Sequence, residues 1–313
     1  MMDISLSRRA AMGTALGAGL ALAAGGPALA APAKSRLILL GTAGGPTPKP
    51  NRAAPAQVII VNGAAYVIDC GNGVARQLIL AGVSLSSLKG LFLTHLHSDH
   101  AADYGNLLLL AWATALGTPV ESFGPPPLVG MTSQFLALNA ADISTRIADE
   151  GRVPLAGLIR PHEITGPGLV YEDANVRVTA ALVEHPPMAP SFAYRFDCAD
   201  RSIVISGDTA PSAGLVALAR GADVLVHEVM MLSALDGLVA AATNASSLRE
   251  HLLASHTTTE QVGRIATEAG VKTLVLSHFV PGGAPFISDE AWRAAVSPHF
   301  SGELIVGRDL LEI

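Results

Sequence analysis

A cluster of metal-binding side chains directly follows a buried-strand pattern near residue 95. The apolar run 91–94 leads into three histidines and one aspartate: His95, His97, Asp99 and His100. His95 and His97 alternate, so their side chains share one face of an extended backbone, and a turn can bring the other two to the same place. Imidazole nitrogens and carboxylate oxygens are ligands for divalent metals, so the cluster predicts a site for two adjacent ions. The alternative, a solvated histidine-rich loop, would leave several polar groups partly buried at the strand end.

The chain beyond residue 30 alternates short apolar runs with helical patterns. With 313 residues, 50% of them hydrophobic and 15% charged, it can bury a full core. Strand-like runs occur at 37–40, 58–61, 66–68, 91–93, 176–183, 192–196, 203–206, 224–226 and 273–276. Helical patterns occur at 74–81, 103–116, 128–139, 212–220, 232–253 and 259–269. No Gly/Ser-rich or charged linker divides them, which predicts a single α/β domain over residues 31–313.

The first thirty residues, 1–30, have the pattern of an export signal. Paired arginines at 8–9 precede a mildly apolar run at 10–24, and the small residues at 27–31 resemble a cleavage site. The arginine pair resembles a twin-arginine signal, which predicts a periplasmic or otherwise exported protein. A membrane anchor is the alternative, but this run and every later apolar run are shorter than the roughly 20 residues that span a bilayer. Export of folded cargo favours two buried thiols over a disulfide between Cys70 and Cys198.

The histidine cluster resembles the hallmark of the metallo-β-lactamase-fold hydrolases, the pattern H-x-H-x-D-H after a strand. Three further residues follow later apolar runs in the order that this family requires: His185, Asp208 and His278. The resemblance covers about residues 37–279 and implies an αββα sandwich with two divalent metal ions, most often Zn²⁺. It implies that one ion is held by His95, His97 and His185, the other by Asp99, His100 and His278, and that Asp208 bridges them. A structural zinc site would instead be a closed four-ligand cage.

Two further motifs resemble one branch of this family, ribonuclease Z and its arylsulfatase-like relatives. His227 and Glu228 match a His-Glu strand end, and His256 with Thr257 and Thr258 matches a helix start. The resemblance implies that His256 is catalytic, as a proton donor or transition-state stabiliser near the leaving group. It implies that His227 and Glu228 support the ligands from behind, and that Asp69 braces the motif loop.

These residues also have purely structural interpretations. His227 can be a buried histidine bonded to a backbone carbonyl, residues 257–259 can cap a helix, and Asp69 can be a turn residue. Three other histidines match no motif and are expected at the surface: His162, His251 and His299.

The implied chemistry is hydrolysis of an ester by a dinuclear enzyme. Two divalent cations lower the pKa of a shared water, which implies a metal-bridging hydroxide as nucleophile. Asp99 would orient that nucleophile, and His256 would assist departure of the leaving group. Two apolar segments, 107–112 and 230–238, could wall a pocket for an aromatic or alkyl group.

Charge narrows the predicted substrate. The formal net charge is −6, so no global basic field attracts nucleic acid. Ribonuclease Z carries a Gly/Pro-tipped basic arm, whereas here the interval 142–172 balances its arginines with carboxylates, a poor phosphate-binding arm. We therefore expect a small phosphodiester or aryl sulfate ester and no nucleic-acid partner. Four alternatives stay open: a lactone or β-lactam ring hydrolase, a tRNA 3′-processing endonuclease, a non-catalytic metal-binding module and, for assembly, a homodimer.

Overall fold

The computed structural model describes residues 34–240, 242, 245–283 and 286–313. These residues lie in one compact unit. No helix among them is long and apolar enough to cross a bilayer. The export signal expected at residues 1–30 lies outside the described residues and stays a prediction.

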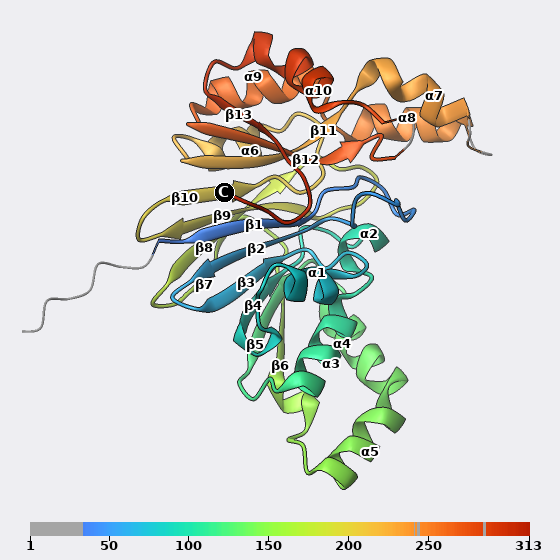
Figure 1. Ribbon diagram of the computed structural model, residues 1–313, viewed down its shortest axis with the longest axis vertical. Helices are drawn as coiled ribbons and strands as arrows, with labels where there is room; N and C mark the ends of the chain where they lie inside the picture. Colours follow the sequence, from blue (N-terminus) through green and yellow to red (C-terminus); the bar gives the residue numbers. More distant parts are fainter. Residues whose placement is uncertain (1–33, 241, 243–244, 284–285) are drawn as a thin grey trace, which may run out of the picture. The chain divides into compact units, whose positions relative to one another are not determined.

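Two seven-stranded sheets form the centre of the fold (Figure 1). The first sheet consists, in spatial order, of β14 (Leu311–Glu312), β1 (Arg36–Gly41), β2 (Ala56–Val61), β3 (Ala64–Ile68), β4 (Leu88–Phe92), β5 (Val120–Gly124) and β6 (Ile159–Glu163). The second consists of β13 (Glu303–Val306), β12 (Thr273–Val280), β11 (Val224–Met230), β10 (Ser202–Ile205), β9 (Ser191–Cys198), β8 (Val176–Val183) and β7 (Gly168–Glu172).

Helices flank both sheets (Figure 1). They are α1 (Val74–Leu80), α2 (Ser98–Ala101), α3 (Tyr104–Thr114), α4 (Leu128–Leu138), α5 (Ala140–Glu150), α6 (Ala213–Ala219), α7 (Leu235–Ala240), α8 (Ala245–Ser255), α9 (Thr259–Ala269) and α10 (Asp289–Val296). Of these helices, α5, α7 and α8 project beyond the sheets (Figure 1). Short 3₁₀ turns are η1 (Leu85–Ser87), η2 (Leu155–Leu158), η3 (Leu232–Ala234) and η4 (Ser297–His299).

Three apolar layers hold the sandwich together. Between the sheets, Phe92 of β4 packs edge-on against Phe196 of β9, with ring centroids 5.1 Å apart. A second layer joins the first sheet to α1 and α3, and a third joins the second sheet to α6, α9 and α10. Burial of these layers is the main favourable term in folding. The predicted αββα sandwich is confirmed.

Local sequence signals fix several helix ends. Thr258 caps α9: its hydroxyl accepts a hydrogen bond from the Gln261 amide, and the Gln261 side chain accepts one from the Thr258 amide. This reciprocal capping box satisfies two amides that a helix leaves unpaired, as the capping interpretation expected. Gly270 ends the same helix at φ 65°, a left-handed conformation that suits glycine.

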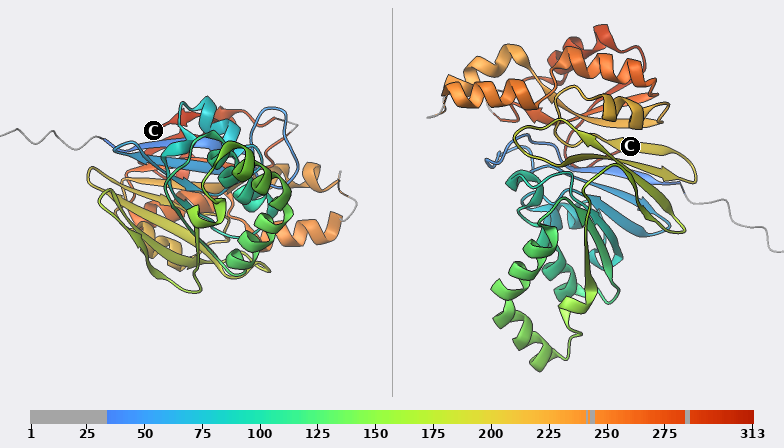
Figure 2. Two further views of the ribbon diagram at one scale, coloured as in Figure 1. Left: turned by 90° about the horizontal axis from the view of Figure 1, so that it is seen from below. Right: turned by 180° about the vertical axis from the view of Figure 1, so that it is seen from behind.

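Three expectations about elements need correction. The helical pattern at 232–253 is divided into η3, α7 and α8. The segment 128–150 forms two helices: α4 packs against the first sheet, and α5 extends away from it (Figure 2). Helix α5 was missed although Ile143 and Ile147, four residues apart, pack against the core. The apolar segment 107–112 does not line the cavity beside the candidate ligands, because Leu107, Leu108 and Trp112 pack in the core under the first sheet.

Candidate metal centre

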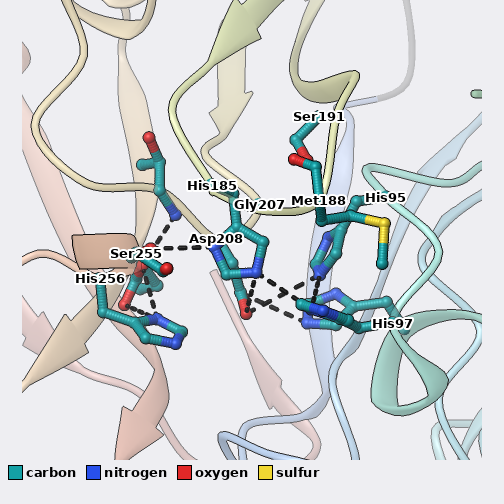
Figure 3. A network of polar contacts seen from close by, with 12 residues as sticks. His95, His97, His185, Met188, Ser191, Gly207, Asp208, Ser255 and His256 are labelled. Atoms are coloured by element: carbon teal, nitrogen blue, oxygen red, sulfur yellow. Dashed lines mark hydrogen bonds and ion pairs between the residues drawn. The ribbon is translucent and has the colours of Figure 1, made fainter. Parts of the chain in front are cut away.

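The seven candidate ligands converge from separate strand ends. His95 and His97 follow β4, Asp99 and His100 lie on α2, and the remaining three follow or end strands of the second sheet: His185, Asp208 and His278. Figure 3 shows His95, His97 and His185 grouped around Asp208. The structure therefore brings together all seven residues that the sequence singled out.

Three histidines form a first group of donors. The Nε2 atom of His95 lies 3.1 Å from Nδ1 of His97, and Nε2 of His185 lies 3.0 Å from the same atom. One ligand atom from each of the three lies within 4.8 Å of the others. A single metal ion could contact all three, because Zn–N distances are about 2.0–2.1 Å.

Asp208 lies between this group and a second one. The second group contains Asp99, His100, Asp208 and His278. Oδ2 of Asp208 is 3.1 Å from Nε2 of His278 and 4.0 Å from Nε2 of both His95 and His185. This placement suits a carboxylate that contacts two ions.

Three histidine donors are held in the neutral state that divalent metals require, whereas Asp208, Asp69 and Asp99 outweigh burial and raise the pKa of His100, which must lose its proton when a metal ion binds. Burial lowers the pKa of His95 and His97, and it lowers that of His185 to about 4, so these rings stay neutral with a free lone pair. The pKa of Asp208 is also lowered, because His278 and His100 outweigh the effect of burial. Nε2 of His100 and Oδ1 of Asp208 have no hydrogen-bond partner among the residues that the structure describes. Buried polar atoms without partners are costly, and two cations among them would remove that cost.

Hydrogen bonds from behind orient the ligand rings. Nδ1 of His100 lies 2.8 Å from the Asp69 carboxylate, and Nδ1 of His185 donates to the Ser255 carbonyl at 2.9 Å. Because Nδ1 is engaged in each ring, Nε2 is left for a metal ion. Asp69 also accepts from the Thr94 amide at 2.8 Å, so it braces the loop that carries the histidine motif.

Backbone conformation fixes two strand ends. Asp69 has φ 61° and His278 has φ 45°, which non-glycine residues rarely adopt. Such strain persists at functional sites where surrounding structure enforces it. Gly207 has φ 61°, and a Cβ there would lie 2.8 Å from Cβ of Thr94, so only glycine fits before Asp208.

His256 and Glu228 form a buried charged pair beside the ligands. Nδ1 of His256 lies 3.0 Å from Oε1 of Glu228, which also accepts from the Thr209 amide. Burial acts to lower the pKa of His256, but the Glu228 carboxylate outweighs it and raises that pKa to about 9. His256 is therefore protonated at neutral pH.

His227 is a buried histidine bonded to a backbone carbonyl, as its purely structural interpretation predicts. Its Nδ1 donates to the backbone carbonyl of Glu228 at 2.7 Å, and burial lowers its pKa to about 4. The Cys70 thiol is buried and that of Cys198 is half-buried; both are free.

A cavity of about 750 Å³ opens beside these residues. Its lining includes His97, Asp99, Asp208, His256 and His278, together with residues of α7, α8 and the loop 44–49. Leu238 lies in this lining, so the expectation of a pocket wall within 230–238 holds at that residue.

Sequence reasoning missed two polar residues of this cavity. Lys49 lines it, and burial lowers the pKa of its ammonium group. His251 also lines it; this histidine, expected at the surface, is half-buried at the wall of the cavity. Its place on the helix that ends next to His256 was the available signal, because residues four apart on a helix share a face, and Ser255 contacts the site.

Comparisons with known proteins agree with this arrangement. Residues 53–278 match the model of the metallo-beta-lactamase superfamily. Ribonuclease Z of Mycobacterium sp. (strain KMS) is 37% identical over 277 residues, which cover 88% of this chain and 94% of that protein. Ribonuclease Z of Mycobacterium avium (strain 104) is 36% identical over 279 residues, covering 88% and 96%. The short form of human tRNase Z has the same fold, with a TM-score of 0.66, 23% identity and coverage of 89% and 98%.

These relatives correct one expectation about partners. From the sequence we expected no nucleic-acid partner, but relatives covering most of the chain are named as ribonucleases. The expectation relied on net charge and on the arginines of one segment, which say little about what a metal centre can bind locally. The names also favour the ribonuclease Z side of the predicted branch over its arylsulfatase-like side.

The fold, the grouped histidines and aspartates and the relatives agree. Superfamily members are hydrolases that typically bind divalent metals, and the two ligand groups here can hold such ions. This chain belongs to the metallo-β-lactamase superfamily, in its ribonuclease Z-like branch.

Proposed function

We propose that this chain is a metal-dependent phosphodiesterase that cleaves RNA, as the name of its ribonuclease Z relatives describes. The observation that carries the proposal is the His256–Glu228 pair beside seven convergent ligand side chains. The pair supplies an acid, and the ligand set supplies a place for a phosphodiester. Tetrahedral sites of imidazole and carboxylate donors suit Zn²⁺, which we propose as the metal.

The roles of the residues follow from their positions. Two divalent ions, when bound, polarise the scissile phosphate and lower the pKa of a water molecule. His95, His97 and His185 would hold one ion, Asp99, His100 and His278 the other, and Asp208 both. Asp99 lines the cavity, where its carboxylate can orient the attacking water.

His256 is the proposed general acid. Its Nδ1 is engaged by Glu228, so the second ring nitrogen carries the proton that can pass to the leaving oxygen. Glu228 keeps this ring charged at neutral pH. Lys49 adds a positive charge on the cavity wall, where it attracts an anionic substrate.

Cleavage assays test this proposal. Zinc-loaded protein is incubated with a tRNA precursor that has a 3′ extension, with bis(4-nitrophenyl) phosphate and with 4-nitrophenyl sulfate. We expect cleavage of both phosphodiesters and its loss in Asp208→Ala. Turnover of the sulfate alone would contradict the proposal.

A small phosphodiester is a second candidate substrate, favoured by one observation. The arginines of the segment 142–172 are engaged by carboxylates: Arg146 with Asp142 and Glu150, Arg152 with Glu150, and Arg160 with Glu121. Paired arginines have less charge to offer RNA phosphates. Cleavage of bis(4-nitrophenyl) phosphate without cleavage of the precursor would favour this candidate.

A further inference from the structure

An apolar wall lines the cavity on the side of α7 and α8. These two helices contribute Leu238, Leu248 and Leu252, and the end of β12 contributes Val280 to the same cavity. Leu252 and Val280 belong to a small buried cluster, against which Leu238 and Leu248 pack. The wall is therefore held in place by the fold rather than formed by exposed side chains.

His251 is a polar side chain within this wall. Its Nδ1 lies 3.3 Å from the hydroxyl of Ser255, one helical turn later. That hydroxyl donates its proton to the Pro186 carbonyl, so it can only accept from His251. Nδ1 of His251 therefore carries the ring proton, and Nε2 is left as a hydrogen-bond acceptor.

The wall and the candidate ligands belong to one cavity. Its volume of about 750 Å³ falls within the range of small-molecule sites. A phosphate bound to the metal ions that Asp99, Asp208 and His278 would hold would have its substituents in the remaining space, beside the leucines. Apolar surface of this kind favours a flat aromatic group over a hydrated one.

We propose that this wall is a subsite for an aromatic group attached to the scissile phosphate, such as a nucleobase, and that His251 accepts a hydrogen bond from it. The inference rests on the proposed phosphodiesterase function, whose substrate class it narrows. A hydrogen-bond acceptor within an apolar wall selects a flat group that carries an amino or hydroxyl donor.

The affinities of two phosphodiesters test the apolar wall with a readout that does not depend on catalysis. Dissociation constants of diphenyl phosphate and dimethyl phosphate are measured by phosphorus NMR on zinc-loaded protein. We expect Leu248→Ser to raise the dissociation constant of diphenyl phosphate about tenfold, or about 1.4 kcal/mol. The dissociation constant of dimethyl phosphate should stay within about twofold of the wild-type value. Leu253→Ser, on an exposed position of the same helix, is the matched control and should change neither. Equal losses for both ligands in Leu248→Ser, or no loss, would overturn the proposal.

A second variant tests the acceptor. His251→Phe keeps a ring of similar size and removes the nitrogen. We expect it to weaken the binding of adenosine 5′-monophosphate, which offers amino and hydroxyl donors, about fivefold or more. The binding of diphenyl phosphate should not change. Unchanged binding of the nucleotide would show that His251 accepts no hydrogen bond from it.

These measurements separate the subsite from the proposed function. If the variants selectively lose affinity for aromatic ligands but the protein cleaves no phosphodiester, the subsite is supported and the phosphodiesterase function is rejected. Cleavage of phosphodiesters with no selective loss would reject the subsite alone.

Discussion

Glu228 controls the protonation state of His256. The carboxylate lies 3.0 Å from the ring and raises the pKa of His256 to about 9. A protonated acid is required for the leaving group, so activity should fall as the pH rises through about 9. In Glu228→Gln the charge is lost, burial lowers the pKa of His256, and this fall should begin at least about one pH unit lower.

The pH profile of kcat on bis(4-nitrophenyl) phosphate checks this prediction. Glu184→Gln is the control, because Glu184 is exposed and adjacent to the ligand His185. A Glu228→Gln enzyme that is slower at every pH, with the wild-type profile, would assign Glu228 a purely structural role.

Asp69 should control metal affinity although it is not a predicted ligand. It engages Nδ1 of His100 and accepts from the Thr94 amide. Asp69→Asn removes the charge that orients this ring, and such losses typically cost about 10–100-fold in metal affinity. Competition with a chromophoric zinc chelator measures the change, with Asp197→Asn on β9 as the control. If Asp69→Asn binds zinc with wild-type affinity, the Asp69 carboxylate only stabilises the turn and does not control metal binding.

At the level of elements, a ligand that follows a strand reaches the site only if the backbone turns sharply at the strand end. Gly207 joins β10 to Asp208 with φ 61°, and a Cβ there would lie 2.8 Å from Cβ of Thr94. Gly207→Ala should therefore lower the free energy of unfolding by about 1–3 kcal/mol and reduce metal binding.

Urea denaturation measures this loss of unfolding free energy. A second glycine, Gly237, serves as the control, because its replacement should not destabilise the protein. Gly237 lies inside α7, and a Cβ there would meet nothing within 4 Å. Gly237→Ala should be neutral or stabilise by up to about 1 kcal/mol, because alanine favours helices. Equal effects of the two variants would contradict the steric explanation for Gly207.

The same elements show what the sequence could predict. Strand β8 and helix α9 have the predicted bounds, because each presents a clear periodic apolar face. Strand β6 was missed because most of its residues are not buried, so no alternation marks it. The division between α7 and α8 was missed because apolar spacing continues across it.

The candidate site was more predictable than its surroundings. The spacing of the 95–100 cluster located four of its ligands, and the family resemblance located the other three, which follow later strand ends in a recognisable order. His251 and Lys49 reach the cavity only because a helix and a loop pack beside it. The placement of Lys49 has no counterpart in local pattern, and the helical spacing between His251 and Ser255 becomes informative only once Ser255 is known to contact the site.

For the whole molecule, the distribution of charge determines how RNA can be bound. The net charge is −6, and several surface arginines pair with carboxylates, among them Arg177 with Glu172 and Arg264 with Glu260. Each cation that neutralises a phosphate adds about −0.7 to −0.9 to the slope of log affinity against log salt. A protein in which many cations are already paired with carboxylates should make fewer such contacts.

We therefore expect a weak salt dependence of RNA cleavage. The slope of log(kcat/KM) against log[KCl] for a tRNA precursor should be shallower than about −3, which corresponds to roughly three or four phosphate contacts. Cleavage of bis(4-nitrophenyl) phosphate, which needs no extended contact, should have a slope near zero and serves as the control. A precursor slope of about −6 or steeper would mean that a broad basic surface forms with RNA, with the arginine–carboxylate pairs of the segment 142–172 opening to reach phosphates. In that case Arg146→Gln should reduce the slope by about one unit, whereas under the expected outcome it should leave the slope unchanged.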